Sequence, residues 1–289
     1  MYNVALIGCG RWGSNHLDML LQQVGYSIEN LYVVDSKAMD NPSIEHIFEH
    51  DEFDHVLELI DIAVIATPNE LHVPQAIKCI DRGIHVLVEK PLSTSIAELE
   101  ALIQHLSMSP STVHVGYLLN SHPAVVAAEP HLVHDSIQYV EFTRYTTRTK
   151  PEHANILDSF LVHALALSIH LGLNFNVQHV DFKKEGIEHT LKLQASNGAD
   201  VHFRVGWDAQ QEHRTIQIHA LKNRIDIDFG DPGLLMLNGI KQPTVTMSAL
   251  QAQWQQFLAK IAMNQTLQPG TILEFQQAYN NLFMALSIL

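Results

Sequence analysis

The fold is decided by three consecutive segments: Asn3-Val-Ala-Leu-Ile7, Gly8-Cys-Gly-Arg-Trp-Gly13 and Ser14-Asn-His-Leu-Asp-Met-Leu-Leu21. The first is a short apolar run typical of a buried strand, and the last repeats its apolar residues at helical spacing. A G-x-G-x-x-G turn between a strand and a helix is the pattern of a dinucleotide-binding site. Its glycines allow a tight turn, a close approach of a pyrophosphate and helix–strand packing, while the helix N-terminus attracts the phosphate charge.

An acidic residue stands at the expected distance beyond this turn. Leu31-Tyr-Val-Val34 predicts a second strand, and Asp35 ends it, 22 positions after Gly13. A carboxylate about 20 residues beyond the turn typically binds the ribose 2′-OH of the adenosine, and it repels the 2′-phosphate of NADP. The sequence therefore predicts NAD as the cofactor, with NADP left open because Lys37 follows two residues later. The alternative is that Asp35 only ends a strand in a turn.

Strands alternate with helices through the first 119 residues. Strands are expected at Asp61–Ala66, His85–Val88 and Val113–Leu118, and helices at about Glu70–Arg82 and Ser95–Leu106. Ser95 and Glu98 have the spacing of a capping box at the start of the second helix. This alternation predicts a doubly wound parallel sheet, an α/β Rossmann domain over residues 1–119. Ligands of such sheets bind outside the carboxyl ends of the strands, where Thr67–Asn69, Glu89–Lys90 and Tyr117 lie.

The second half, residues 120–289, has a different pattern, and the chain length also favours two domains. Strands are expected at Ile137–Thr147, Gln178–Lys183, Glu188–Ala195, Asp200–Trp207, Thr215–Ala220 and Arg224–Phe229. Helices are expected at Pro123–Val133, Asn155–Leu171, Ser248–Ala262 and Ile272–Ser287. Asn197-Gly198 and Lys222-Asn223 read as hairpin turns, which predicts an α+β domain with a mainly antiparallel sheet. Helices are expected to cover one face of this sheet and a second subunit the other, so the chain is expected to form a homo-oligomer.

The composition excludes several functional classes. The chain carries a formal charge of −14, whereas nucleic acid and anionic membranes both need a basic patch, so neither is expected as a partner. No apolar segment approaches the roughly 20 residues of a membrane span, and a strand that starts at residue 2 leaves no room for a secretion signal. Two cysteines make no disulfide framework, which predicts a cytoplasmic protein. The 19 histidines are scattered, so no metal site is expected.

Three motifs together resemble a known family. They are the Gly8–Gly13 turn, Ala66-Thr-Pro-Asn69 with His72, and Glu89-Lys-Pro91. This set closely resembles the glucose–fructose oxidoreductase, inositol dehydrogenase and rhizopine catabolism (Gfo/Idh/MocA) family, and the resemblance covers nearly the whole chain. It implies hydride transfer between NAD or NADP and a ring hydroxyl of a sugar or polyol. Within the family, the chain looks most similar to members that act on nucleotide-linked sugars.

The resemblance and the strand ends give the expected site residues. The cofactor-binding set is Gly8, Gly10, Arg11, Trp12, Gly13, Asp35, Ala66, Thr67, Pro68, Asn69, His72, Glu89 and Lys90. The substrate-binding set is Lys90, Tyr117, Arg144, Asp158 and His163. By resemblance, Lys90 contacts the substrate hydroxyl and helps to move its proton, and a partly desolvated lysine beside the nicotinamide has the lowered pKa that this needs. Trp12 is expected to pack at the helix start rather than to stack on the cofactor.

His163 is the second expected catalytic residue, as a proton relay or as the partner of Lys90. Many family members carry an Asp four residues before this histidine or immediately after it, whereas this chain has Ser159 and Ala164 there. Asp158 stands five residues before His163, and in an α-helix it would point roughly 140° away. A histidine buried in the core is the alternative reading of His163, and a capping acid is that of Asp158.

Arg144 and Arg148 lie on the strand that precedes the His163 helix. They could bind a substrate phosphate or carboxylate, because a guanidinium matches these groups with two parallel hydrogen bonds. The alternative is a pair of exposed strand arginines. For the whole chain, the two functional readings are an NAD(P)-dependent dehydrogenase and a dinucleotide-binding sensor or partner subunit without turnover.

Overall fold

The protein consists of two compact units. A computed structural model describes residues 1–36, 46–49, 53–152, 155–175, 180–230 and 233–287. The N-terminal unit comprises Met1–Gly116 and Gln253–Leu273, and the C-terminal unit comprises Tyr117–Ala252 and Glu274–Leu289. The sequence places the boundary at residues 119 and 120, close to Gly116, but it does not foresee that a segment near the end of the chain joins the first unit.

The N-terminal unit is built on a six-stranded parallel sheet. Its strands are β1 (Tyr2–Ile7), β2 (Ile28–Asp35), β3 (His46–Glu49), β4 (Ile62–Ile65), β5 (His85–Val88) and β6 (Val113–Val115). Their order in the sheet is β3-β2-β1-β4-β5-β6, the order of a dinucleotide-binding fold. The side chains of β4 are fully buried, as expected for a strand covered on both faces. The predicted doubly wound sheet is confirmed.

Helices connect these strands. They are α1 (Gly13–Leu21), α2 (Phe53–Val56), α3 (Asn69–Ile80) and α4 (Ile96–Ser107). Ser95 caps α4 as predicted, because its hydroxyl accepts from the backbone N–H of Glu98. The predicted return bond of the capping box is not formed, since Glu98 Oε2 instead accepts a hydrogen bond from Ser93 Oγ at 2.5 Å.

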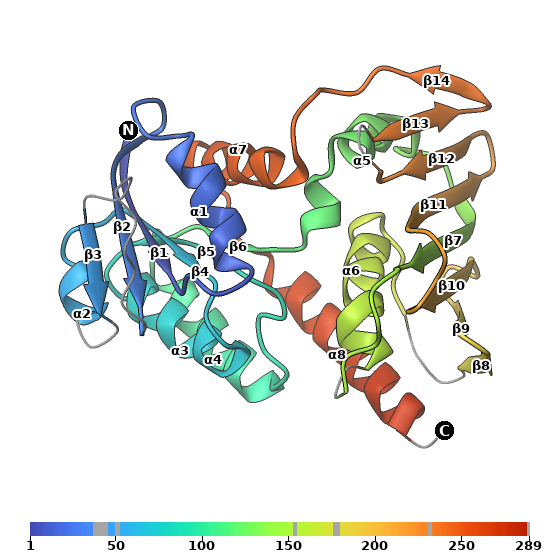
Figure 1. The fold of residues 1–289 in the computed structure, drawn as a ribbon, viewed down its shortest axis with the longest axis horizontal. Helices are drawn as coiled ribbons and strands as arrows, with labels where there is room; N and C mark the ends of the chain where they lie inside the picture. Colours follow the sequence, from blue (N-terminus) through green and yellow to red (C-terminus); the bar gives the residue numbers. More distant parts are fainter. Residues whose placement is uncertain (37–45, 50–52, 153–154, 176–179, 231–232, 288–289) are drawn as a thin grey trace. The chain divides into compact units, whose positions relative to one another are not determined.

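Helix α7 (Ala249–Ala262) packs largely with the N-terminal unit, although it comes from the end of the chain (Figure 1). The buried Trp254 donates its indole N–H to Ser27 Oγ at 3.2 Å. After the helix, Thr266 Oγ1 accepts from the backbone N–H of Val113 on edge strand β6 at 3.0 Å. These contacts give the segment after residue 252 its place beside the first sheet.

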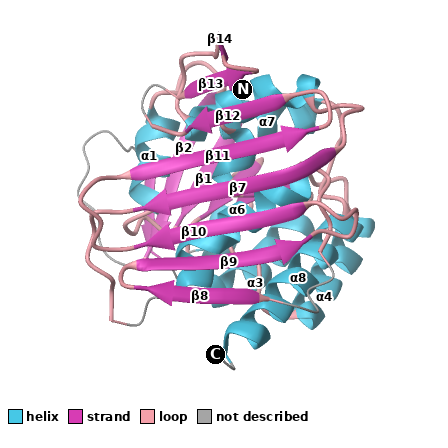
Figure 2. Cartoon of the chain, turned by 90° about the vertical axis from the view of Figure 1, so that its right-hand side faces the viewer, coloured by secondary structure: helices cyan, strands magenta, loops and turns pink. Residues whose placement is uncertain are grey.

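The C-terminal unit is built on an eight-stranded sheet (Figure 2). Its strands are β7 (Ile137–Tyr145), β8 (Asp181–Glu185), β9 (Glu188–Gln194), β10 (Asp200–Gly206), β11 (His213–Ala220), β12 (Arg224–Asp228), β13 (Leu234–Leu237) and β14 (Ile240–Gln242). The sheet is mainly antiparallel, as predicted, but its central pair β7–β10 is parallel. The chain crosses from β7 to edge strand β8 and returns through two hairpins, so that β10 runs in the same direction as β7. Residue 178, where the sequence predicts a strand to begin, lies outside the described residues.

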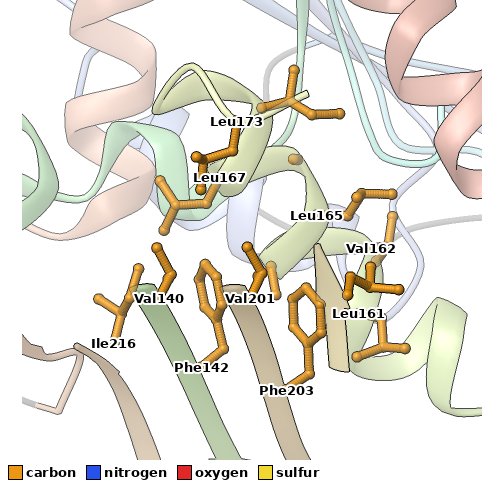
Figure 3. Packing of buried hydrophobic residues seen from close by; sticks show 14 of the residues in the cluster. Val140, Phe142, Leu161, Val162, Leu165, Leu167, Leu173, Val201, Phe203 and Ile216 are labelled. Carbon is orange, nitrogen blue, oxygen red and sulfur yellow. The ribbon is translucent and has the colours of Figure 1, made fainter. Parts of the chain in front are cut away.

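Helices cover one face of this sheet. They are α5 (Pro123–Ala128), α6 (Val162–His170) and α8 (Pro269–Ser287). Leu165 and Leu167 of α6 point toward Val140, Phe142 and Phe203 of the sheet (Figure 3). Helix α8 begins three residues earlier than predicted, because proline is well tolerated in the first turn, where its missing N–H has no helical partner. Among the described residues, no helix is both long and apolar enough to span a bilayer.

Candidate functional site

The predicted site residues of the N-terminal unit follow directly after neighbouring strands. The last ladder bonds of these strands run from Gly8 N to Val34 O at 2.8 Å, from Ala66 N to Ile7 O at 2.8 Å and from Glu89 N to Ile65 O at 2.9 Å. The backbone therefore brings the glycine turn, the segment after β4 and the segment after β5 to one edge of the sheet. This edge includes the point where the strand order reverses between β1 and β4, which is where ligands of such sheets bind.

Two positions of the glycine turn, Gly8 and Gly13, have no room for a side chain. Gly8 has φ = +88°, and a Cβ there would lie 2.9 Å from the backbone of Ala66. A Cβ at Gly13 would lie 2.1 Å from the carbonyl oxygen of Gly8, so only glycine lets α1 start this close to β1. A Cβ at the exposed Gly10, in contrast, would meet no described atom within 4 Å. The turn is thus tightly packed at Gly8 and Gly13 and open at Gly10. An open backbone at this point fits a bound pyrophosphate.

The carboxylate of Asp35 is fixed at this turn. Its Oδ2 accepts a hydrogen bond from the backbone N–H of Cys9 at 2.6 Å. Burial and the nearby carboxylates of Asp35 and Asp18 raise the pKa of the Cys9 thiol, so the thiol stays neutral. The turn and the end of β2 are joined by this bond, which puts an acidic group where a ribose hydroxyl would bind. Lys37, the residue that would favour NADP, lies outside the described residues.

Glu89 is held by three donors. The carboxylate is buried, and its Oε1 accepts from Trp12 Nε1 at 2.6 Å and contacts His16 Nε2 at 2.8 Å. Its Oε2 accepts from the backbone N–H of Lys90 at 3.2 Å. Since Oε1 is an acceptor, His16 carries a proton on Nε2. Glu89 therefore ties the start of α1 to the end of β5.

His72 joins two other segments of the site. It is buried on α3, with Nε2 2.8 Å from Thr67 O and Nδ1 2.8 Å from Pro91 O. The hydroxyl of Thr67 donates to the buried Gln75 Oε1 at 2.7 Å. Both ring nitrogens of His72 are thus engaged within the protein, so His72 holds the segment after β4 against the segment after β5. Pro68 and Asn69 follow Thr67 directly, and both are exposed at the edge of the sheet where the strands end.

Lys90 follows Glu89 directly and is half-buried. Its backbone is fixed by Glu89 on one side and by the His72 contact with Pro91 on the other. A lysine amine with a fixed backbone and partial exposure can donate hydrogen bonds to a bound ligand. Arg11 and Trp12 are exposed at the same edge, with 41% of Trp12 accessible. Trp12 lies at the helix start, as predicted, and it also donates the hydrogen bond to Glu89.

His16 is a residue of this candidate site that the motifs miss. It lies on the apolar side of α1 and is fully buried, so the sequence suggests an ordinary core histidine. Trp12 and His16 are four residues apart, which puts them on the same side of a helix. That spacing is the signal that could have identified them as joint partners of a strand-end carboxylate.

In the C-terminal unit, the segment before His163 is not a regular α-helix. Leu157–Leu161 form a π-helical turn, closed by the backbone N–H of Val162 donating to Leu157 O, and α6 continues from there. Because a π turn bonds residue i to i+5, positions 158 and 163 lie about one turn apart on the same side. The expectation of a 140° offset, which assumed an α-helix, is wrong for this backbone. The side chain of Asp158 lies outside the description.

The other predicted substrate residues also belong to the C-terminal unit. His163 is half-buried at the start of α6. Tyr117 packs its ring 4.9 Å from that of Phe275, and burial raises the pKa of its hydroxyl. Arg144 lies near the end of β7, with its guanidinium carbon 5.7 Å from the ring centre of Phe160. Among the described residues, no group of three or more histidine, cysteine or acidic side chains could hold a metal ion.

The chain was compared with known proteins. A family model described as "Oxidoreductase family, NAD-binding Rossmann fold" matches residues 2–117. A 4-carboxy-2-hydroxymuconate-6-semialdehyde dehydrogenase from Sphingobium is 27% identical over 179 residues, 58% of this chain and 57% of that protein. An inositol 2-dehydrogenase from Rhodococcus erythropolis is 28% identical over 123 residues, 40% of this chain and 35% of that protein. The matches thus span just over half and about a third of these relatives.

A solved structure extends the similarity of fold to the second unit. A UDP-N-acetylglucosamine 3-dehydrogenase from Acidithiobacillus ferrooxidans superposes with a TM-score of 0.80, covering 96% of this chain and 95% of that one. Its sequence identity is 19%, so it supports the shared fold alone. The glycine turn, the Glu89-Lys-Pro91 segment and the matched residues agree with the resemblance seen in the sequence. Residues 2–117 thus match the model of the NAD-binding Rossmann fold of the Gfo/Idh/MocA oxidoreductase family, which supports the resemblance over this part of the chain.

Proposed function

We propose that this protein is an NAD-dependent oxidoreductase that transfers a hydride between nicotinamide and a ring hydroxyl or ketone of a sugar, polyol or sugar nucleotide. One observation carries the proposal. The open glycine turn holds the Asp35 carboxylate at 2.6 Å from Cys9 N, and Lys90 follows a strand of the same sheet. The candidate dinucleotide site and the candidate proton-transfer group therefore both lie at the ends of strands of one parallel sheet.

The chain's own groups fit the two ends of a dinucleotide. The N-terminus of α1 and the backbone at Gly10 would hold the pyrophosphate, and Asp35 would accept from the ribose hydroxyls of the adenosine. A carboxylate at that place repels a 2′-phosphate, so we propose NAD rather than NADP. When bound, the nicotinamide supplies the hydride acceptor at its C4 atom. Arg11, Trp12 and the exposed Pro68–Asn69 segment would border it.

Lys90 is the proposed proton-transfer group. A hydride leaves a carbinol carbon readily only as the hydroxyl proton is removed, so a base must lie within hydrogen-bond reach of that hydroxyl. Glu89 and His72 fix the backbone on either side of Lys90, which orients the base before substrate arrives. His163 is proposed as the second group that handles the proton. The π turn over Leu157–Leu161 supports this proposal, because it brings positions 158 and 163 toward the same side of the helix.

The proposed substrate class follows the relatives. One relative is an inositol 2-dehydrogenase, and the superposed structure is that of a dehydrogenase named for a nucleotide-linked sugar. The alternative of a dinucleotide sensor without turnover has no support in these names, which are those of dehydrogenases. We further propose that the protein is cytoplasmic and forms a homo-oligomer through the uncovered face of its C-terminal sheet (Figure 2).

A substrate screen tests the proposal. The purified protein is mixed with NAD and a panel of aldoses, inositols and nucleotide sugars, and NADH formation is followed by absorbance. Reduction of NAD by at least one compound, lost in Lys90→Ala, is the expected result. Binding of NADH without any hydride exchange between NAD or NADH and a member of the panel would favour a dinucleotide-binding sensor over an enzyme.

A further inference from the structure

Three arginines gather at one end of the C-terminal sheet. Arg144 of β7 and Arg214 of β11 are direct partners in the antiparallel register, so their side chains emerge on the same face. Arg148 follows β7 in the next loop. Arg148 and Arg214 both lie close enough to lower the pKa of Arg144 by repulsion. Like charges on opposed strand positions are unfavourable, so this end of the sheet needs an explanation.

Arg144 is the centre of this cluster. It shares the helix-covered face with Phe142, and its guanidinium carbon lies 5.7 Å from the ring centre of Phe160. Its Nε is buried without a hydrogen-bond partner, and no described carboxylate lies within ion-pair distance of it. Burial, with the neighbouring arginines, lowers its pKa to about 10. A buried guanidinium N–H without a hydrogen-bond acceptor is costly, which indicates a place for an anion.

The neighbouring acidic group does not supply that partner. Glu212 Oε1 accepts from Thr146 Oγ1 at 2.8 Å and from the backbone N–H of Thr147 at 2.8 Å. Its other oxygen is 3.9 Å from Arg214. Glu212 is thus already held by the loop after β7, and its ion pair with Arg214 is long.

We propose that Arg144, Arg148 and Arg214 form an oxyanion-binding site that takes a phosphate or carboxylate group of the substrate. This rests on the proposed function, and it narrows the substrate class from any sugar or polyol to an anionic one. A planar guanidinium binds two oxygens of such a group at once, and the anion would supply the acceptor that Arg144 Nε lacks among the described residues. The two threonines beside Glu212 hold the loop that carries Arg148.

Three ligands with one sugar ring test the site: glucose 1-phosphate, glucuronate and neutral glucose. Each is titrated calorimetrically into the full chain, as wild type and as Arg144→Met, Arg214→Met and Arg224→Met. Arg224 is the matched control, because it belongs to the same sheet but pairs with Asp226 at 3.1 Å. We expect one of the anionic sugars to bind at least about tenfold more tightly than glucose. Arg144→Met and Arg214→Met should lose that advantage, and Arg224→Met should keep it.

The anionic sugar that binds more tightly identifies the chemical group that the site binds, phosphate or carboxylate. Equal affinity for glucose and both anionic sugars would overturn the inference, as would an advantage that survives in Arg144→Met and Arg214→Met. Thermal unfolding supplies a second readout, because removal of an unpaired buried charge should leave Arg144→Met at least as stable as the wild type. An NADH titration of the same sample reports on the proposed function separately. NADH binding without any preference for anions would refute the oxyanion site alone.

Discussion

His16 Nε2 lies 2.8 Å from Oε1 of Glu89, and this contact joins the helix of the glycine turn to the strand end that carries Lys90. Both side chains are buried. The same carboxylate oxygen also accepts from Trp12. The part of the fold that would hold a dinucleotide and the residue that would move a proton are therefore mechanically connected through one carboxylate.

Replacing His16 by leucine should destabilise the protein by about 1–3 kcal/mol, because a buried carboxylate loses one of its donors. Affinity for NADH should fall as well, since the start of α1 loses its bond to β5. Thermal unfolding and fluorescence titration measure the two effects. His105→Leu is the control: His105 also contacts a carboxylate, Asp81 at 2.6 Å, but that pair is exposed and should contribute little. Equal losses in both variants would contradict the role given to Glu89.

Two similar substitutions in the glycine turn should differ in their effect on stability. Gly10→Ala places a methyl group in open space, so the fold should keep its melting temperature while NADH affinity falls at least about tenfold. Gly13→Ala forces a methyl group to within 2.1 Å of the Gly8 carbonyl oxygen, so stability and NADH affinity should fall together. Thermal unfolding with and without NADH separates the two. Gly10→Ala with unchanged affinity would show that no pyrophosphate approaches the turn.

Lys90→Ala should reduce turnover by about 10²–10⁴-fold and leave NADH affinity nearly intact, because the base acts on the substrate hydroxyl. Steady-state kinetics and NADH titration measure the two quantities on one preparation. Lys78→Ala is the control, since Lys78 is exposed on α3 and pairs with Asp54 at 2.9 Å. A Lys90→Ala enzyme with wild-type turnover would remove Lys90 from the chemistry.

Stability should fall as the pH drops from about 7.5 toward 5.5. Burial lowers the pKa of His122, and its Nδ1 accepts the capping hydrogen bond from Ala124 N, so only the uncharged ring makes this cap. A folded-state pKa below the ordinary value of 6.5 means that this contribution is complete above 6.5 and is lost as the pH falls toward the folded-state value. Burial also lowers the pKa of His85, His189 and His202.

His122→Asn tests this assignment, because asparagine caps helices and does not titrate in this range. The slope of melting temperature against pH should become shallower, with the other three histidines accounting for what remains. His134→Asn is the control: His134 is exposed with φ = 65°, a conformation that asparagine tolerates. A His122→Asn slope equal to that of the wild type would assign the acid sensitivity elsewhere.

Much of the N-terminal unit is predictable because each parallel strand is a local signal. Ile62–Ile65 is a wholly apolar run, and Thr67–Asn69 end it with turn residues. Strands of this kind place their following residues at one edge, so the positions of Asp35, Ala66 and Glu89 could be predicted from order alone.

The C-terminal sheet shows where local signals are missed or fail. Asn238 and Gly239 both have positive φ and join β13 to β14. Asn-Gly is typical of a hairpin turn, but this turn is not among those predicted above. Leu234–Leu237 is short and uniformly apolar, so its periodicity indicates nothing. The parallel pairing of β7 with β10 depends on how the chain crosses between them, and no local pattern encodes that.

The contacts that join the candidate site residues could not be predicted from the sequence. His16 lies on an apolar helix face, and its partner Glu89 belongs to a distant strand, so the pair exists only in the folded protein. The π turn over Leu157–Leu161 is a shift in hydrogen bonding from i+4 to i+5, which no composition signals. Both features arise from tertiary packing rather than from local propensity.

The most direct test is a fluorescence titration of the wild-type protein with NADH and, separately, with NADPH. Asp35 at the glycine turn predicts saturable binding of NADH with clearly weaker binding of NADPH. Asp35→Ser should narrow that difference, because the repulsion of a 2′-phosphate is removed. Preference of the wild type for NADPH would contradict the role of Asp35. Binding of neither nucleotide by the folded protein would contradict the proposed function as a whole.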